Sequence, residues 1–394
     1  MYSCDVPRSA VEPQAALRLR AGATTDLDSL AFEWEELAER VDGSPFLRPG
    51  WILPWLEAFA TGTPEAITVH RGDELVAVLP MQRHRGRLSA PANWHSPVFG
   101  PLAADEEARE LLLEHLFDGG RAAVELSLLD GDSDIDHFAR AAGRRVVARA
   151  IAACPVVEMT GRFEDYERGL SRNRRRSLRR GRRALEARGE VTFHVHEGLE
   201  GLDEVLEEVF RVEACGWKSA RGTAIASQLE TTRFYTDVAR WAAARGWLRL
   251  SLLRLDGRAI ACDYSIEFAG AWWSLKSGYD EEYRSFGPGA LLLREQLRHC
   301  FERGATCLEL LGTEDVFKRS WTDRSCERTR VHAFDHSPAG LVAWSQVATR
   351  ERLRPAVNWF RERVQNGIAR GHHAFASMLA TWDQLGLEAL AVGA

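Results

Sequence analysis

Hydrophobic and polar positions follow a similar pattern at two places in the chain. The segments "ITVHRGDELVAVLPM" (67–81) and "LSLLRLDGRAIACDYSI" (250–266) each hold two β-type apolar runs, separated by Gly-Asp in the first and Asp-Gly in the second. A Gly-Asp or Asp-Gly pair between two β-type runs is typical of a tight turn. The sequence therefore predicts one β-hairpin in each half of the chain.

A second likeness lies downstream of each hairpin. "LEHLFDGGRAAVEL" (113–126) aligns without gaps on "LRHCFERGATCLEL" (297–310), so that position 113 corresponds to position 297. The identical pairs are Leu113/Leu297, His115/His299, Phe117/Phe301, Gly120/Gly304, Glu125/Glu309 and Leu126/Leu310. Phe-Gly-Pro stands upstream of both, at 99–101 and 286–288. Helix–Gly–strand junctions resemble one another in many proteins, but six matches with shared flanks favour an internal duplication.

The duplicated unit is predicted as a hairpin, a further strand, a glycine turn, a helix and a strand. We expect a flexible N-terminus over 1–25, a first domain over 26–155, a second over 156–336 and a helical extension over 337–394. The extension has apolar residues at helical spacing, among them Leu341, Trp344 and Val347. This spacing indicates helices that pack on the body, and a membrane-surface role is the weaker alternative.

Composition narrows the class of protein. The chain has 394 residues, of which 45% are hydrophobic and 27% charged, and its net charge is −6, which is typical of a soluble globular protein with room for two cores. We find no apolar run long enough to span a membrane and no apolar core of a signal peptide. The seven cysteines form no C-x-x-C pair, so we expect reduced thiols in a cytoplasmic protein. The pair His194 and His196 is more often structural than metal-binding, and we expect no metal.

Only the second copy carries the pattern R-x-x-G-x-G, formed by Arg284, Gly287 and Gly289 in "YRSFGPGALLLREQL". The first N–H groups of a helix have no partner within it, and the helix dipole places partial positive charge there. Glycines let the backbone approach an anion closely, and the arginine adds charge at the rim. The pattern is consistent with a pyrophosphate site, whereas an ordinary Gly-Pro-Gly turn that starts a helix is the simpler alternative.

The order of elements over 246–312 resembles the acyl-CoA-binding core of GNAT acyltransferases. Further segments extend the resemblance: "FLRPGWILPWLEAF" (46–59), "DELVAVLPM" (73–81), "RNRRRSLRRGRRALEARG" (172–189), "EACGWK" (213–218), "FGPGALLL" (286–293) and "LGTEDVFKRSW" (311–321). Together they look like a bacterial family of tandem-GNAT acetyltransferases tied to the synthesis of cellulose or other exopolysaccharides, distantly similar to Fem-type aminoacyltransferases. The resemblance covers roughly residues 30 to 335.

The resemblance implies a mixed α/β (α+β) fold with two GNAT-like domains, each a mostly antiparallel sheet flanked by helices. The first domain would be a degenerate support and the second would hold acetyl-CoA or another acyl-CoA. The residues expected to bind this donor are Arg284, Ser285, Phe286, Gly287, Gly289 and Ala290. One departure stands out, because the family usually has tyrosine where Phe317 precedes Lys318.

Acyl transfer from a thioester to an amine needs a polarised carbonyl, a base for the amine and a stabilised thiolate. We find no nucleophile motif, so direct attack in a ternary complex is the simpler scheme. If residues 269–270 form a two-residue turn, Asp263 lies opposite Lys276 and both point to one face. Asp263 is then a candidate general base and Lys276 a candidate substrate-binding residue, with a solvated salt bridge as the alternative.

The remaining candidates come from motifs near the second hairpin. Glu213 is a second candidate for the base, although an acid at the end of an amphipathic helix often faces solvent. Tyr264 and Tyr279 are candidate proton donors to the leaving thiolate. The candidate substrate-binding residues besides Lys276 are Lys318, Trp321 and Trp217.

The segment "RNRRRSLRRGRR" (172–183) holds eight arginines and no acid, so that the rest of the chain carries −14. Ser171 and Gly189 would bound one helix. Three interpretations remain open: a solvated helix, a contact to nucleic acid such as tRNA, or docking of a polyanionic donor such as CoA or an acyl carrier protein. Two alternatives to an acyl-CoA-dependent transferase follow from these interpretations. One is a Fem-like aminoacyl-tRNA-dependent or carrier-protein-dependent transferase, and the other is a non-catalytic binder of an anionic polymer. The acceptor would be a small molecule or a glycan precursor.

Overall fold

The computed structural model describes residues 18–118, 120–215, 225 and 228–369. Its first half contains the elements β1 (Leu19–Thr24), α1 (Leu27–Arg40), η1 (Pro45–Leu47), α2 (Pro49–Phe59), β2 (Thr63–Arg71), β3 (Glu74–His84), β4 (Arg87–Ser89), β5 (Leu102–Ala103), α3 (Glu106–Asp118), β6 (Ala123–Asp130), α4 (Ile135–Ala141) and β7 (Arg145–Glu158).

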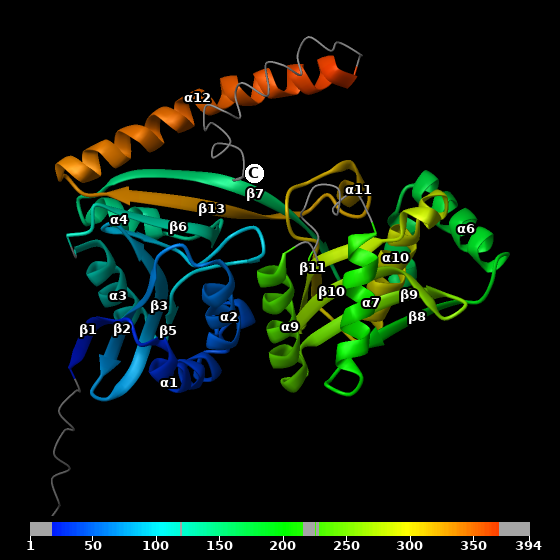
Figure 1. Ribbon diagram of the computed structural model, residues 1–394, viewed down its shortest axis with the longest axis horizontal. Coiled ribbons are helices and arrows are strands. Elements are labelled where there is room, and N and C mark those ends of the chain that lie inside the picture. The colour runs from blue at the N-terminus through cyan, green and yellow to red at the C-terminus, as the bar shows by residue number, and fades with distance from the viewer. Residues whose placement is uncertain (1–17, 119, 216–224, 226–227, 370–394) are drawn as a thin grey trace, which may run out of the picture.

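The second half adds α5 (Phe163–Gly169), α6 (Arg172–Glu186), β8 (Val191–His196), α7 (Leu202–Ala214), α9 (Leu229–Ala244), β9 (Leu248–Leu255), β10 (Arg258–Phe268), β11 (Ala271–Tyr279), η3 (Glu281–Phe286), α10 (Pro288–Glu302), β12 (Cys307–Glu309), α11 (Val316–Arg319), β13 (Ser325–Phe334) and α12 (Pro338–Ala369). The strands form one sheet in the order β1-β2-β3-β4-β6-β13-β7-β12-β11-β10-β9-β8, and β5 pairs with β3 beside this path (Figure 1).

The two halves repeat the same backbone at the offset that the sequence predicts. The parallel pair of β4 and β6 joins 87–89 to 123–125. The parallel pair of β11 and β12 joins 271–273 to 307–309. The residue numbers of the two pairs differ by the same offset that aligns position 113 with position 297. Leu128 and Gly312, which correspond at the same offset, both have a left-handed backbone with φ of 61°. The predicted mixed α/β fold, mostly antiparallel and duplicated, is confirmed.

The last strand of each half lies in the other half's part of the sheet. β13 pairs antiparallel with both β6 and β7, and β7 pairs at its end with β12. Figure 1 shows β7 and β13 side by side above the first half. The expected domain boundary between residues 155 and 156 falls inside β7, so one continuous ladder of backbone hydrogen bonds joins the halves.

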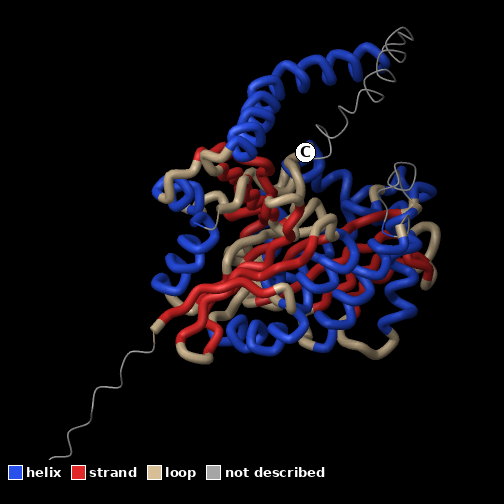
Figure 2. Tube along the Cα trace, turned by 60° about the vertical axis from the view of Figure 1, so that its left-hand side comes forward, coloured by secondary structure: helices blue, strands red, loops and turns tan. Residues whose placement is uncertain are grey.

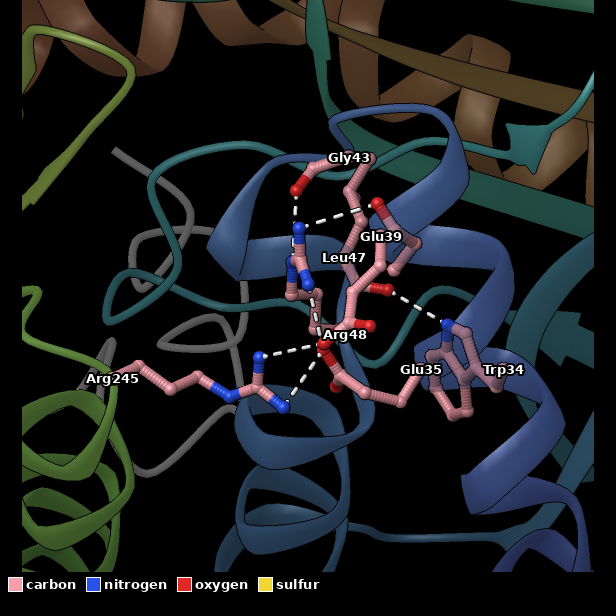
Figure 3. A network of polar contacts seen from close by, with 8 residues as sticks. Trp34, Glu35, Glu39, Gly43, Leu47, Arg48 and Arg245 are labelled. Atoms are coloured by element: carbon pink, nitrogen blue, oxygen red, sulfur yellow. Dashed lines mark hydrogen bonds and ion pairs between the residues drawn. The ribbon is translucent and has the colours of Figure 1, made fainter.

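A buried arginine network also joins the halves (Figure 3). Arg48 is 3% exposed and donates to the carbonyl oxygen of Gly43 (2.9 Å) and to the carboxylate of Glu35 (2.6 Å). Arg245, at the end of α9, lies 3.1 Å from the same carboxylate and 3.3 Å from that of Glu39. A buried guanidinium is tolerated when its charge is paired and its N–H groups are bonded. The first-half helix α1 is thereby tied to the second-half helix α9.

The expected C-terminal extension begins as one long helix, α12, which runs away from the body along much of its length (Figure 2). Near its start Ala343, Trp344 and Val347 pack on Ala123 and Phe334, as the helical spacing predicts. Leu341 is 37% exposed and lies at the edge of this contact. Residues 370–394 of the predicted extension lie outside the described residues. Within the part of the chain that the structure describes, no helix has the length and apolar character needed to cross a membrane.

Candidate active site

The glycine turn of the second half leads directly into α10. The 3-10 helix η3 ends at Gly287, whose φ of 67° is left-handed, and α10 begins with Pro288. A proline here has no N–H and its fixed φ suits a helix start. The amides of Ala290 and Leu291 both donate to the carbonyl oxygen of Gly287 at 3.1 Å. Fewer amides are available to a ligand than the sequence suggested, but α10 has no side-chain cap and no acidic residue in its first turn.

The equivalent helix start in the first half is closed by its own carboxylates. At the offset of the duplication, Asp105 stands where the second half has Gly289. One oxygen of Asp105 accepts the amide of Ala108 at 2.9 Å, and Glu106 and Glu107 fill the first turn of α3. The hydrogen bond from Ala108, followed by the one from Arg71, lowers the pKa of Asp105. A further anion is therefore disfavoured at α3 and favoured at α10.

The Phe-Gly-Pro of the first half also differs in structure from that of the second. Residues 99–101 lead into the short strand β5, which pairs with β3, and α3 begins only at Glu106. The identical tripeptides are therefore not equivalent helix starts. A run of three residues carries too little information to determine the conformation of the chain after it.

The glycine turn lies at the surface beside the arginine-rich helix α6. Arg284 is 75% exposed and lies 3.7 Å from Glu281, while Arg188 stands 4.7 Å above the ring of Phe286. Ser285 is exposed, and residues 286 to 290 are half-buried, apart from the buried Pro288. Two hollows among the described residues lie elsewhere, near the starts of α7 and α9. Residues of the turn line neither hollow, and Arg284 and Ser285 are exposed to solvent.

The sheet opens next to this turn. β11 pairs with β12 only from Ala271 to Trp273, after which β12 ends in a turn where Leu311 and Gly312 both have positive φ. β11 continues to Tyr279 and leads into η3. Two parallel strands that diverge in this way expose backbone N–H and C=O groups along the edge of β11. From Ser274 onward β11 therefore has no strand partner on this side among the described residues, and it leads into the glycine turn.

The structure places Asp263 and Lys276 on opposite faces of the sheet, so the expected pairing is wrong. The two-residue turn at 269–270 is present, but Leu275 is an extra residue that forms a β-bulge. Tyr264 therefore lies opposite Lys276, and Asp263 lies opposite Ser277. A single inserted residue turns every later side chain to the other face.

Asp263 is 3% exposed and lies beneath α10. It accepts hydrogen bonds from the hydroxyls of Ser265 and Ser274 and from the side-chain amide of Gln296, the last at 2.8 Å. A buried carboxylate with these donors is stabilised in place. Its oxygens are directed into the packing between sheet and helix.

Lys276 lies on the other face, where the halves meet. Its Nζ stands 3.5 Å from the ring centre of Trp94, which is supplied by the first-half segment after β4. Next to it, the ring Nδ1 of His95 lies 3.0 Å from the hydroxyl of Tyr235 in α9. Burial, followed by the positive charge of Lys276, lowers the pKa of His95 to about 2. The neutral imidazole therefore stays uncharged at physiological pH.

Glu213 and Tyr264 share the face of Lys276. Glu213, 1% exposed near the end of α7, accepts the amide of Ile225 at 2.8 Å. Its backbone touches β11 where Gly278 has no side chain, since a Cβ there would lie 2.5 Å from the Cα of Glu213. Tyr264 donates its hydroxyl to the carbonyl of Tyr235 at 3.0 Å, and burial raises its pKa well above the usual value.

The remaining candidates divide between the turn and the region beyond β12. Tyr279 lies beside the turn, with its ring carbon Cδ1 3.3 Å from the position of a Cβ on Gly289, and burial raises its pKa. Lys318 donates its Nζ to the carbonyls of Leu311 and Thr313. Trp321 is 3% exposed within the core. Trp217 lies outside the described residues.

Sequence reasoning missed the contribution of the first half to this junction. Trp94 and His95 lie in "PANWHSP" (91–97), a loop-type stretch with a tryptophan and a histidine. Aromatic and titratable residues in a loop are a signal for a binding site. The signal was present, but the local pattern gave no hint that this loop contacts α9 and β11.

Comparisons with known proteins agree with this geometry. Residues 172–319 match the family model described as an acetyltransferase (GNAT) domain. No curated protein matches the chain significantly. The solved C-terminal domain of a putative lysylphosphatidylglycerol synthetase from Agrobacterium fabrum is 15% identical with a TM-score of 0.53, and the match covers 80% of this chain and 96% of that one. The solved structure of FemX is 12% identical with a TM-score of 0.53, covering 78% of this chain and 97% of that one.

At these identities the two solved structures show a shared fold. The family match covers the strands and helices that surround the glycine turn and leaves the first half unmatched. The second half is therefore a GNAT-type domain, and the chain is an enzyme of the transferase class.

Proposed function

We propose that this transferase moves an acyl group from an acyl-CoA to an amine or hydroxyl acceptor by direct attack. The observation that carries the proposal is the contrast between the starts of the two corresponding helices, α3 and α10. The start of α3 is capped by Asp105 and has two glutamates in its first turn, whereas the start of α10 has no side-chain cap and no acid in its first turn. A helix N-terminus without its own carboxylate is suited to bind a phosphate.

The donor would lie along the turn and enter the gap between β11 and β12. Its pyrophosphate would contact the backbone of Gly289 and of Gly287, where an added Cβ would meet nothing within 4 Å. The other contacts to it would come from Arg284, Ser285, Phe286 and Ala290. The edge of β11 beyond Trp273 would offer hydrogen bonds to the amide groups of the donor's pantetheine chain, as one strand does to another. Acetyl-CoA is the simplest donor of this kind.

The chemistry would need no covalent enzyme intermediate. The acceptor nitrogen attacks the thioester carbonyl carbon, the C–S bond breaks, and the amine proton passes to a base. Glu213 is favoured over Asp263 as this base, because it shares the junction face with Lys276 while Asp263 lies beneath α10. Tyr279 is favoured over Tyr264 as the proton donor to the thiolate, because it lies beside Gly289 and its raised pKa keeps it protonated.

The acceptor would bind at the junction of the halves, near Lys276 and Trp94. The ammonium group suits an acceptor with a carboxylate or phosphate, such as a glycan precursor. Trp217, which lies outside the described residues, stays a predicted substrate contact. Lys318 and Trp321 are less favoured as substrate contacts, because Lys318 holds the turn after β12 and Trp321 lies in the core. The link to cellulose or other exopolysaccharides rests on the family resemblance alone.

A second candidate keeps the transferase chemistry and changes the donor. The exposed arginines of α6 favour a donor carried on a larger polyanion, either a carrier protein or an aminoacyl-tRNA. The non-catalytic binder of an anionic polymer is the alternative that remains if neither donor is used.

Calorimetric titration of CoA into the purified protein tests the proposal, with the matched variants Gly289→Asp and Gly289→Asn. The aspartate adds a carboxylate to the first turn of α10, which α3 already has and α10 lacks. We therefore expect CoA affinity to fall about tenfold or more, whereas the isosteric asparagine should cost much less. Mass spectrometry of the native protein for a retained thioester gives an independent readout. Absence of CoA binding in the unaltered protein, or equal loss in both variants, contradicts the proposed donor site.

A further inference from the structure

Five arginines of α6 form a single stripe on the solvent side of the helix. They recur at i, i+4, i+7, i+8 and i+11, which places them on one face along ~16 Å of helix axis. All five are exposed: Arg172, Arg176, Arg179, Arg180 and Arg183. The opposite face of α6 buries Leu178, Gly181 and Leu185 against the body.

The stripe is not neutralised by the body on which it lies. Among the residues that the structure describes, none of the five makes an ion pair, whereas Arg182 on the flank pairs with Glu186 at 2.6 Å. The eight arginines of 172–183 stand against a charge of −14 for the rest of the chain. Five parallel guanidinium groups repel one another, so the stripe costs folding stability that a bound polyanion would restore.

The position of α6 connects the stripe with the proposed donor site. Gly181 packs directly on the carbonyl oxygen of Phe286 in the glycine turn. The stripe itself lies on the other side of the helix, about 10 Å from the turn, so it is separate from the contacts proposed for CoA. At the N-terminal end, Arg174 stands 5.3 Å from the ring of Phe317 in α11. Phe317 is 42% exposed and its neighbour Val316 is 88% exposed.

From this arrangement we infer that the stripe docks a small acidic carrier protein whose acyl thioester is borne on a phosphopantetheine arm. The inference rests on the proposed function, since the arm has the same chemistry as the pantetheine end of CoA. Carboxylates on a helix of the partner can match arginines that recur every turn. Phe317 lies beside Arg174, which is on the face of α6 opposite the stripe, so the charges of the stripe carry the contact with the partner.

The observations favour a small protein over a long nucleic acid. An RNA stem would extend beyond the stripe and meet the acidic remainder of the chain, whereas a compact carrier domain needs only the stripe. In the transfer step the acceptor nitrogen bonds to the acyl carbon, the bond to the arm's sulfur breaks, and the thiolate takes a proton. The products are the acylated acceptor and the carrier with a free thiol.

The experiment compares the full chain with two triple variants of equal charge change. Arg176→Glu, Arg179→Glu and Arg183→Glu reverse the stripe, and Arg85→Glu, Arg87→Glu and Arg352→Glu reverse three exposed arginines elsewhere. The probes are an acyl-loaded acidic carrier protein, an RNA duplex and vesicles of anionic phospholipid. Binding and acyl transfer are measured for each, and acyl transfer from acyl-CoA is measured in parallel.

We expect the carrier protein to bind with marked salt dependence and to lose at least tenfold in affinity in the stripe variant, with less than a twofold change in the control. Transfer from acyl-CoA should change less than twofold in both. Equal carrier binding by all three proteins overturns the inference, as does stripe-dependent binding of RNA or vesicles in its place. If the unaltered protein transfers no acyl group from acyl-CoA, the proposed function is contradicted. The comparison of carrier binding between the two variants can still be interpreted in that case.

Discussion

Gly181 of α6 lies so close to the carbonyl oxygen of Phe286 that a Cβ built on the glycine would be 2.2 Å from that oxygen. The arginine-rich helix and the glycine turn are therefore fitted to one another at a backbone contact. A glycine in the middle of a helix costs about 1 kcal/mol relative to alanine. The close approach explains why α6 keeps one.

Gly181→Ala should destabilise the protein and weaken CoA binding, because α6 must move away from the turn. The gain of about 1 kcal/mol in helix propensity is smaller than the overpacking cost of ~1–3 kcal/mol. Denaturant unfolding and CoA titration measure the two effects. Ser177→Ala, at an exposed position of the same helix, is the matched control and should not destabilise. An alanine at 181 that raises stability contradicts the close fit.

The sequence predicted the features that are encoded locally and missed those that depend on one residue or on distant strands. The difference in residue number between corresponding positions of the two copies stays constant from the hairpins through β12, because the corresponding segments have equal lengths there. The bulge at Leu275 leaves no mark on the apolar pattern, so the face of Lys276 was predicted wrongly. The exchange of β7 and β13 between halves also has no local signal, because strand pairing across the chain is set by the whole sheet.

The buried pair of Arg328 and Glu309 gives a test of how the halves are held together. Arg328 in β13 donates to both carboxylate oxygens of Glu309 in β12 at 2.9 Å, and each residue is 5% exposed. Arg328→Met would leave the carboxylate buried without this partner, at a cost of about 3–5 kcal/mol. Chemical denaturation at pH 7 measures the loss. The double variant with Glu309→Leu should recover part of it.

The pH dependence of the same variant follows from the pKa of Glu309. Burial raises this pKa above its ordinary value of 4.5, with Arg328 opposing the shift. An acid with a raised pKa in the folded state binds more protons when folded. The cost of its buried charge to the free energy of unfolding therefore falls as the pH is lowered toward 4.5. Arg328→Met should therefore be less harmful at pH 5 than at pH 7. Arg324→Met, which breaks an exposed pair with Glu158, should cost less than about 1 kcal/mol at either pH.

The exchanged strands predict that neither half folds by itself. A first half ending at residue 160 would leave β6 and β7 without β13 between them, and a second half beginning at 161 would leave β12 without β7. Unpaired strand edges of this kind lead to aggregation. We expect each half expressed alone to be insoluble, and co-expression to give a soluble complex. Cooperative unfolding of either isolated half would contradict this.

As with the fold, the part of the candidate site that is encoded by neighbouring residues was predicted from the sequence, and the part that joins distant segments was not. The glycine turn is a local motif, and its residues do lie together at the start of α10. The junction formed by Trp94, His95 and Lys276 is not local, because it joins a first-half loop to a second-half strand. Its recognition required the three-dimensional arrangement.

His95 should dominate the loss of stability in mild acid. Its ring stacks on Phe59 at 4.8 Å and is hydrogen-bonded to Tyr235, and its pKa falls from 6.5 to about 2. A histidine with a depressed pKa binds fewer protons when folded, so its stability contribution is complete above 6.5 and is lost as the pH falls below that value. Between pH 6.5 and 5 the loss amounts to about 2 kcal/mol.

His95→Gln should remove this dependence, although it costs some stability at pH 7 because the stacking on Phe59 is lost. Unfolding free energies at pH 7, 6 and 5 then give a flatter curve for the variant than for the unaltered protein. His84→Gln, at an exposed position of β3, is the control and should keep the original slope. If the unfolding free energy of His95→Gln depends on pH as steeply as that of the control, protonation of His95 does not govern the loss of stability in acid. The junction of the halves then tolerates a charged ring.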